Sequence, residues 1–218
     1  MIKIFGDTEF TGLKQETTLI SIGLKAETGQ TFYAELTDYD KLQVNDWIQH
    51  HVIDNLFLGP EHESVDKATA QHIRFRGEKK YAAQLLKEWF RLHFPPVQQC
   101  QLWWDCGAYD HVLLTDLLAD YTKGYPSLPP QLHYISMDLA TLLELAGLDP
   151  DINREHLAGD VMNLPPDSPL WFDGGKHNAL WDALVIEQCY RRAKAVLEHK
   201  YITGDDAGVY SPNPQSNG

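Results

Sequence analysis

Positive charge is scarce in this 218-residue sequence. It holds 18 Lys and Arg against 31 Asp and Glu, which gives a formal net charge of −13. Proteins that coat long nucleic acids gain affinity by neutralising many phosphates with a basic surface. The charge balance therefore argues against a coating protein of that kind, while it leaves a local contact with a short nucleic acid open.

Long hydrophobic runs and cysteines are scarce as well. No window approaches the roughly 18 uncharged apolar residues of a membrane span, and the first residues lack a basic region followed by an apolar run. We therefore expect no membrane partner and a cytoplasmic location. The three cysteines, Cys100, Cys106 and Cys189, lack metal-ligand spacing and are expected to be reduced thiols without a catalytic role.

Apolar and aromatic residues are plentiful. Hydrophobic residues make up 43% of the chain, with six Trp, ten Tyr and eight Phe, which is typical of a folded globular protein. The length favours a single core. We expect one domain over residues 1–202 and a disordered tail over 203–218.

The residue patterns predict strands first, and then strands mixed with helices. The expected strands are 2–9, 17–27 and 30–36, which form an antiparallel meander, followed by 100–104 and 132–137. The expected helices are 45–57, 77–94, 109–121, 138–147 and 177–199. Residues 58–76 read as a polar loop and 149–176 as largely irregular. This order indicates an α/β or α+β fold with a mixed sheet.

Two acids lie at the end of the first predicted strand. Side chains alternate faces along a strand, so Asp7 and Glu9 would point the same way and repel each other. A divalent cation with a preference for oxygen would let both ionise. The spacing alone is equally typical of a strand end with two solvated acids, so other acids must complete the pattern.

Further acids follow later in the chain. Asp110 lies at a strand-to-helix junction and Asp105 at the end of the preceding strand, although both positions also suit ordinary helix caps. His177 and Asp182 are five residues apart, which turns a helix by about 140°, so one of them must lie outside it. The preceding Gly174 and Gly175 favour a flexible position for His177. A rigid Asp suits metal ligation, and such a His suits a general base.

These residues together resemble a known family. Asp7-Thr8-Glu9, Asp110 in a Tyr-Asp-x-x-x-Leu context and His177-x4-Asp182 are similar in order and spacing to the DEDDh 3′→5′ exonucleases. Within that group, "DTEFTGL", "LISIGL", "YDHVLL" and "HNALWDAL" look most like a small bacterial and phage exoribonuclease branch. The resemblance implies a ribonuclease H-like α/β fold, with a mixed five-stranded sheet flanked by helices. Asp105 departs from the pattern, since many relatives carry Asn there, and its role stays open.

The resemblance also implies a metal site. Asp7, Glu9, Asp110 and Asp182 would hold two Mg²⁺ or Mn²⁺ ions, with Asp7 bridging between them and Asp110 approaching the second ion. His177 would take the proton from the attacking water, with Glu9 and Asp110 completing the catalytic set.

Residues next to the acids are candidates for substrate binding. Glu9, Thr11 and the backbone of Gly12 would contact the terminal ribose, and Phe10 or Leu13 would wedge against the last base. Core packing is an equal alternative for Phe10 and Leu13. In the expected loop, Arg74, Phe75 and Arg76 would either grip phosphates or be solvated.

We therefore expect a metal-dependent 3′→5′ exonuclease that acts on the 3′ ends of single-stranded RNA or short overhangs. A DNA exonuclease of proofreading or repair type fits the same motifs, because contact with the 2′-hydroxyl cannot be read from the sequence. A nucleic-acid-binding module without activity is a third alternative, and a homodimer is left open.

Overall fold

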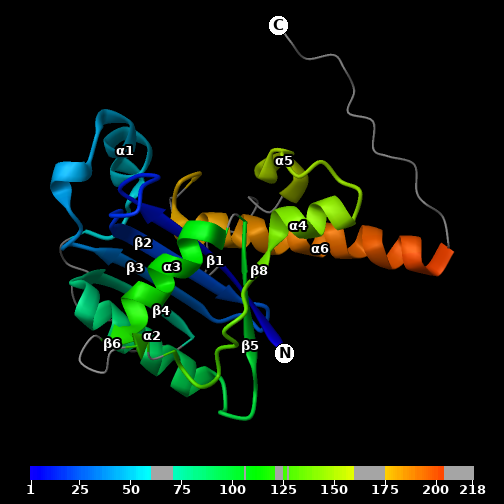
Figure 1. Ribbon diagram of the computed structural model, residues 1–218, viewed down its shortest axis with the longest axis horizontal. Helices are drawn as coiled ribbons and strands as arrows, with labels where there is room; N and C mark the ends of the chain where they lie inside the picture. The colour runs from blue at the N-terminus through cyan, green and yellow to red at the C-terminus, as the bar shows by residue number, and fades with distance from the viewer. Residues whose placement is uncertain (60–70, 106, 121–124, 127, 160–174, 204–218) are drawn as a thin grey trace, which may run out of the picture.

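A six-stranded mixed sheet forms the centre of the molecule. The computed structural model describes residues 1–59, 71–105, 107–120, 125–126, 128–159 and 175–203, so Cys106, Gly174 and the expected tail from 204 onward lie outside it. The strand order is β4-β3-β2-β1-β5-β8 (Figure 1). The strands are β1 (Ile2–Phe10), β2 (Leu19–Ala26), β3 (Thr31–Leu36), β4 (His72–Gly77), β5 (Cys100–Trp104) and β8 (Met137–Asp138). The short strands β6 (Ala119–Asp120) and β7 (Tyr125–Pro126) pair separately.

The expected meander is present, and the parallel pairings extend it on both sides. Strand β2 pairs antiparallel with β1 and β3, whereas β4 runs parallel to β3, β5 parallel to β1, and β8 parallel to β5. The α/β class with a mixed sheet is therefore confirmed.

The expected strand count of five was wrong, because β4 lies within the segment expected to be a polar loop. Ile73 and Phe75 are buried while His72, Arg74 and Arg76 are half-buried, so a strand pattern of period two runs through this charged stretch. The strand expected at 132–137 is reduced to β8 and a single bridge from Leu132 to Cys100. Residues 60–70 of the expected loop lie outside the described part of the chain.

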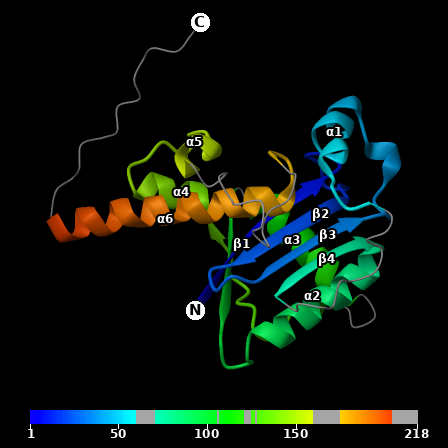
Figure 2. The same cartoon turned by 180° about the vertical axis from the view of Figure 1, so that it is seen from behind.

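Helices cover both faces of the sheet (Figures 1 and 2). They are α1 (Asp46–His51), α2 (Lys79–His93), α3 (Gly107–Leu118), α4 (Leu139–Leu145), α5 (Arg154–Ala158) and α6 (Ala179–Thr203). Short 3₁₀ turns occupy Lys41–Gln43 and Ile53–Asn55. Helix α5 lies in the segment expected to be irregular, where the Asn153 side chain caps it by accepting from the His156 N–H. None of the described helices is both long and apolar enough to span a membrane.

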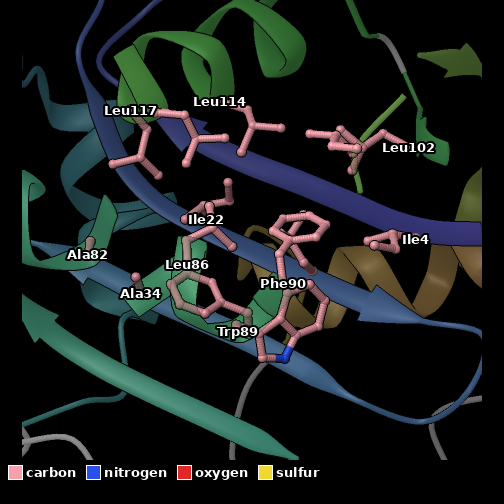
Figure 3. Close-up of a cluster of buried hydrophobic side chains, with 14 of the residues drawn as sticks. Ile4, Ile22, Ala34, Ala82, Leu86, Trp89, Phe90, Leu102, Leu114 and Leu117 are labelled. Carbon is pink, nitrogen blue, oxygen red and sulfur yellow. The ribbon is translucent and has the colours of Figure 1, made fainter. Parts of the chain in front are cut away.

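Two apolar layers hold the helices on the sheet. On one face, α2 and α3 pack against the sheet through large side chains that include Leu86, Trp89, Phe90, Leu114 and Leu117 (Figure 3). On the other face, α4, α5 and α6 form a second cluster with Phe5 and Trp103. Strands β2 and β3 are buried on both faces along their whole length.

Gly23 sets how closely α6 approaches the sheet. A Cβ atom at this position would lie 2.3 Å from the backbone of Ala179, the first residue of α6. Gly23 is also the partner of Asp7 in the β1–β2 pairing. The start of α6 is therefore seated directly on the part of the sheet that carries Asp7.

Candidate active site

The carboxyl end of β1 carries the first two acids. The pairing of β1 with β5 runs only from Ile2 to Phe5, so the following residues of β1 extend past the parallel strand. Asp7 and Glu9 both line one pocket. Thr8 between them points to the opposite side, as expected for alternate residues of a strand.

Asp110 is attached to β1 from the α3 side. Its Oδ1 accepts a hydrogen bond from the Thr8 backbone N–H at 3.0 Å and another from the Thr8 hydroxyl at 2.6 Å. The Thr8 N–H is available because β5 no longer runs alongside β1 at this point. Asp110 is therefore buried at the same end of the sheet as Asp7 and Glu9, as the sequence predicted, although it does not line the pocket itself.

His177 and Asp182 are brought together because His177 lies outside the helix. Asp182 is in the first turn of α6, and its Oδ2 accepts a hydrogen bond from the His177 backbone N–H at 2.9 Å. His177 adopts a φ of 67°, the left-handed region that a side chain disfavours. This turn directs the imidazole toward β1, where Nδ1 lies 3.9 Å from Glu9 Oε1.

A buried hydrogen-bond network supports this turn. Asn178 is fully buried, and its Oδ1 caps α6 by accepting from the Leu180 N–H at 3.1 Å. Its Nδ2 donates to the Tyr33 hydroxyl at 3.1 Å and to the Asn55 carbonyl at 3.3 Å. The Tyr33 hydroxyl in turn donates to Glu35 at 2.9 Å. The residue next to His177 is thus tied to β3 and to the segment after α1.

Two aromatic residues of α1 lie against the His177 ring, and the sequence analysis missed them. Trp47 and His51 stack at 4.6 Å between ring centroids, and both rings meet His177 edge-on, at 5.3 and 6.2 Å. Their spacing of four residues places them on one helix face, which was a readable signal. The Trp47 side chain is 53% exposed, so an indole face is accessible next to His177.

The acids share a low-dielectric site, and their pKa values rise together. Burial is the largest cause for each, and the neighbouring carboxylates add to the shift for Asp7 and Glu9. The pKa of Glu9 rises to about 8, that of Asp182 to about 7 and that of Asp110 to about 6. Burial lowers the pKa of His177, so its imidazole is neutral near pH 7. The acids outnumber the two cationic side chains of the pocket, Arg154 and Lys176, and a bound cation would let more of these acids ionise.

The pocket has a volume of about 600 Å³ and lies between β1, the residues before α5, and the start of α6. Among its lining residues, Glu9, His177 and Asp182 offer ligand atoms that all lie within 4.8 Å of one another. Asp105, whose role the sequence left open, forms an ion pair with Arg154 at 2.7 Å. The carboxylate oxygens of Glu9 and Asp182 are donors that suit Mg²⁺ or Mn²⁺, so the residues present fit a divalent metal.

Of the expected substrate-binding residues, Glu9 lines this pocket, whereas Phe10, Thr11, Gly12 and Leu13 are not among its lining residues. Phe10 stacks on Tyr109 and packs against the core, as its alternative reading proposed. The Thr11 hydroxyl is buried and donates to Gln43 at 2.7 Å. Gly12 has a φ of 142°, and the following Leu13 is 79% exposed. Leu13 is the most exposed of these three side chains.

The sequence left two roles open for residues 74–76, a phosphate grip or a solvated loop, and the structure shows that they belong to β4 and not to a loop. Phe75 is buried in the core, Arg74 lies over the Phe57 ring at 5.5 Å, and Arg76 lies 3.9 Å from Glu35. Three further cations on α2 and α6 are paired with acids, namely Lys79 with Asp116, Lys80 with Glu78 and Arg191 with Glu187. The charge of each of these three cations is therefore offset by a neighbouring acid.

Comparisons with known proteins identify the family of the chain. The model of the 3′-5′ exoribonuclease Rv2179c-like domain matches residues 2–193. Two Mycobacterium tuberculosis proteins, the 3′-5′ exoribonucleases Rv2179c (strain ATCC 25618 / H37Rv) and MT2234.1 (strain CDC 1551 / Oshkosh), are each 32% identical over 146 residues, which is 67% of this chain and 76% of theirs.

One solved structure shares the fold. A full-length 3′-exonuclease is 11% identical, with a TM-score of 0.51, over 99% of this chain and 92% of its own. The Neurospora crassa Pan2 catalytic unit is 13% identical, with a TM-score of 0.49, and the chain spans 30% of its length. Because the family model covers nearly all of the described residues, the chain belongs to the Rv2179c-like 3′-5′ exoribonuclease domain family.

Proposed function

We propose that this protein is a metal-dependent 3′→5′ exoribonuclease that removes nucleotides from the 3′ ends of short single strands. The observation that carries the proposal is the convergence of Asp7, Glu9, Asp182 and His177 on one pocket, with Asp110 fixed behind β1. Membership of an exoribonuclease family supports RNA as the substrate class.

Asp7, Glu9 and Asp182 would hold one divalent ion, and Asp7 and Asp110 would serve a second. A pair of such ions would make water a better nucleophile at neutral pH and would stabilise negative charge on the leaving oxygen. The raised pKa values of the four carboxyl groups support this assignment, because bound cations would allow all of them to ionise in a buried site.

His177 would act as the general base. Its lowered pKa keeps the imidazole neutral and able to accept a proton near pH 7. The hydrogen bond from its backbone N–H to Asp182 fixes the ring relative to a proposed metal ligand. The edge contacts with Trp47 and His51 restrict the ring further.

Asp110 would approach the second ion from a position that Thr8 fixes. The two hydrogen bonds from Thr8 hold one of its carboxylate oxygens against β1, where its negative charge raises the pKa of Asp7 and Glu9. We assign Thr8 as the residue that orients this carboxylate, since metal-ligating acids commonly depend on such partners.

The 3′ end would be bound by stacking and local contacts. The exposed indole of Trp47 and the exposed side chain of Leu13 both offer apolar surface to a base, which tolerates any sequence. We propose that Glu9 and the backbone around Gly12 contact the terminal ribose. The pairing of so many basic residues with acids supports binding of only a few nucleotides.

Incubation with matched RNA and DNA single strands tests the proposal. With Mg²⁺ or Mn²⁺ we expect a ladder of products that shorten from the 3′ end of the RNA, and no cleavage when EDTA is present. Faster cleavage of the DNA strand would instead favour the proofreading or repair type of exonuclease. Absence of cleavage on both strands at saturating metal would support the binding module.

A further inference from the structure

Two cationic side chains, Arg154 and Lys176, are among the described residues that line the pocket. Six acids line it as well. A single strand brings one negative charge for each nucleotide, so the cation that meets a phosphate determines how the strand is held. The question of which cation does so rests on the function proposed above.

Arg154 is already engaged within the protein. Its Nε donates to Asp105 at 2.7 Å, Nη1 to the Ile152 carbonyl at 2.6 Å and Nη2 to the Pro150 carbonyl at 2.7 Å. The side chain is 20% exposed. Three of the five N–H donors of its planar guanidinium are used, so turning the side chain toward a phosphate would break three hydrogen bonds.

The Asp105–Arg154 pair joins two parts of the chain across the pocket. Asp105 directly follows β5, whereas Arg154 begins α5, which packs on α6. The Arg154 carbonyl also accepts from the Cys189 thiol of α6 at 3.2 Å. The pair therefore holds residues 150–155 in place as one wall of the pocket.

Lys176 is in the opposite situation. Its carbonyl accepts a hydrogen bond from Asn55 at 3.2 Å, which fixes the backbone next to His177. Its side chain is exposed, lines the pocket, and makes no hydrogen bond or ion pair within the part of the chain that the structure describes. A lysine is a point charge on a flexible stem and reaches phosphates in varied positions.

We propose that the two cations have separate roles: Lys176 binds a backbone phosphate of the substrate, and Arg154 is a positioning residue that builds the pocket wall with Asp105. The proposal predicts that the salt dependence of RNA binding changes with Lys176 alone.

Equilibrium binding of a short fluorescent RNA with Mg²⁺, at several salt concentrations, separates the two roles. Binding is measured with protein that also carries His177→Ala, so that the RNA is not degraded during the measurement. One phosphate contact with a single strand contributes about 0.7 to the slope of log affinity against log salt, so Lys176→Gln should make the slope shallower by about 0.7. The double variant Asp105→Asn/Arg154→Gln keeps the net charge and should leave the slope unchanged, while it lowers the melting temperature and weakens binding at every salt concentration.

Lys87→Gln on α2 is the matched control, because it removes one positive charge from the opposite face of the sheet and should leave the slope unchanged. An unchanged slope in Lys176→Gln, or a shallower slope in the double variant, would overturn the proposal. If the otherwise unaltered protein bound RNA but did not cleave it, the exoribonuclease function would be contradicted. The separate roles of Lys176 and Arg154 would not be. Failure to bind RNA at all would contradict both.

Discussion

At the scale of single residues, the position of His177 depends on a backbone conformation that its own sequence does not favour. Its φ of 67° is a left-handed conformation that costs about 1–2 kcal/mol in a residue with a side chain. The hydrogen bond to Asp182 and the buried cap of Asn178 offset that cost. Backbone strain of this kind is common at functional sites, where a side chain must be held in one orientation.

Removing one proposed metal ligand tests the acid cluster. Asp7→Asn and Asp182→Asn should each lower RNA cleavage by more than about 10²-fold. Loss of a residue that only hydrogen-bonds to a metal ligand already costs about 10- to 100-fold in metal affinity or activity. The folded structure should persist in circular dichroism spectra. Glu88→Gln, at an exposed acid of α2, is the matched control and should retain full activity. Activity within about tenfold of the unaltered protein at saturating metal would refute the site.

Removing the imidazole tests the proposed base. His177→Ala should lower the turnover rate by about 10² to 10⁴-fold, as expected for loss of general base catalysis, and leave metal affinity nearly unchanged. Isothermal titration with Mn²⁺ measures that affinity. A large loss of Mn²⁺ binding would show that His177 is a ligand, in keeping with its place among the three residues whose ligand atoms lie within 4.8 Å.

The raised carboxyl pKa values predict how pH and metal affect stability. In the metal-free protein the pKa values of Asp110, Asp182 and Glu9 lie at about 6, 7 and 8, above the values of about 4 in an unfolded chain. The folded protein then binds more protons than the unfolded chain between pH 4 and 8, so its stability falls as pH rises through that window. Melting curves with EDTA should therefore show a lower melting temperature at pH 8 than at pH 5.

Added Mn²⁺ should reverse this trend, because it binds the ionised carboxylates and releases protons. We expect a larger rise in melting temperature at pH 8 than at pH 5. A melting temperature in EDTA that does not change with pH would indicate that these acids are not crowded together.

At the scale of helices and strands, the contact of α6 with Gly23 sets the geometry of the site. The sequence predicted both β2 and α6. A glycine within a strand, however, does not indicate which helix packs against it. The 2.3 Å distance to the Ala179 backbone leaves no space for a methyl group. Close backbone approach is a recurrent reason for glycine inside a strand.

Gly23→Ala should therefore push the start of α6 away from the sheet and separate Asp182 from Asp7. We expect a loss of stability of about 1–3 kcal/mol, as for other overpacked cores, together with a marked fall in turnover. Urea denaturation and steady-state kinetics measure the two effects. Full activity with full stability would show that α6 shifts without consequence for the site.

The sequence predicted the elements whose residues follow a regular period, and missed those set by contacts across the fold. Strands β1, β2, β3 and β5 were predicted to within a few residues, whereas β4 was taken as loop because charged residues flank its buried Ile73 and Phe75. The order of the acids predicted the cluster of Asp7, Glu9 and Asp182. The Asp105–Arg154 pair and the contact of Trp47 with His177 join residues far apart in the chain, and no local pattern reports such contacts.

At the scale of the whole molecule, the net charge of −13 opposes long-range attraction of nucleic acid. The protein should therefore act distributively and prefer short single strands or overhangs to duplex interiors. Product ladders from a long single strand, recorded with excess unlabelled trap, should show many intermediates. Rapid processive digestion despite the trap would reveal a basic groove that the paired residues of α2 and α6 do not form.

The direction of α6 has a practical consequence for work with this protein. The helix begins at the pocket and runs for 25 residues to Thr203, a length of about 37 Å, and its far end projects beyond the sheet (Figure 1). An affinity tag, dye or surface linkage attached after Thr203 would be separated from His177 by this rigid spacer. Immobilised or labelled protein of that design should retain the turnover of the free enzyme, which makes single-molecule observation of strand shortening feasible.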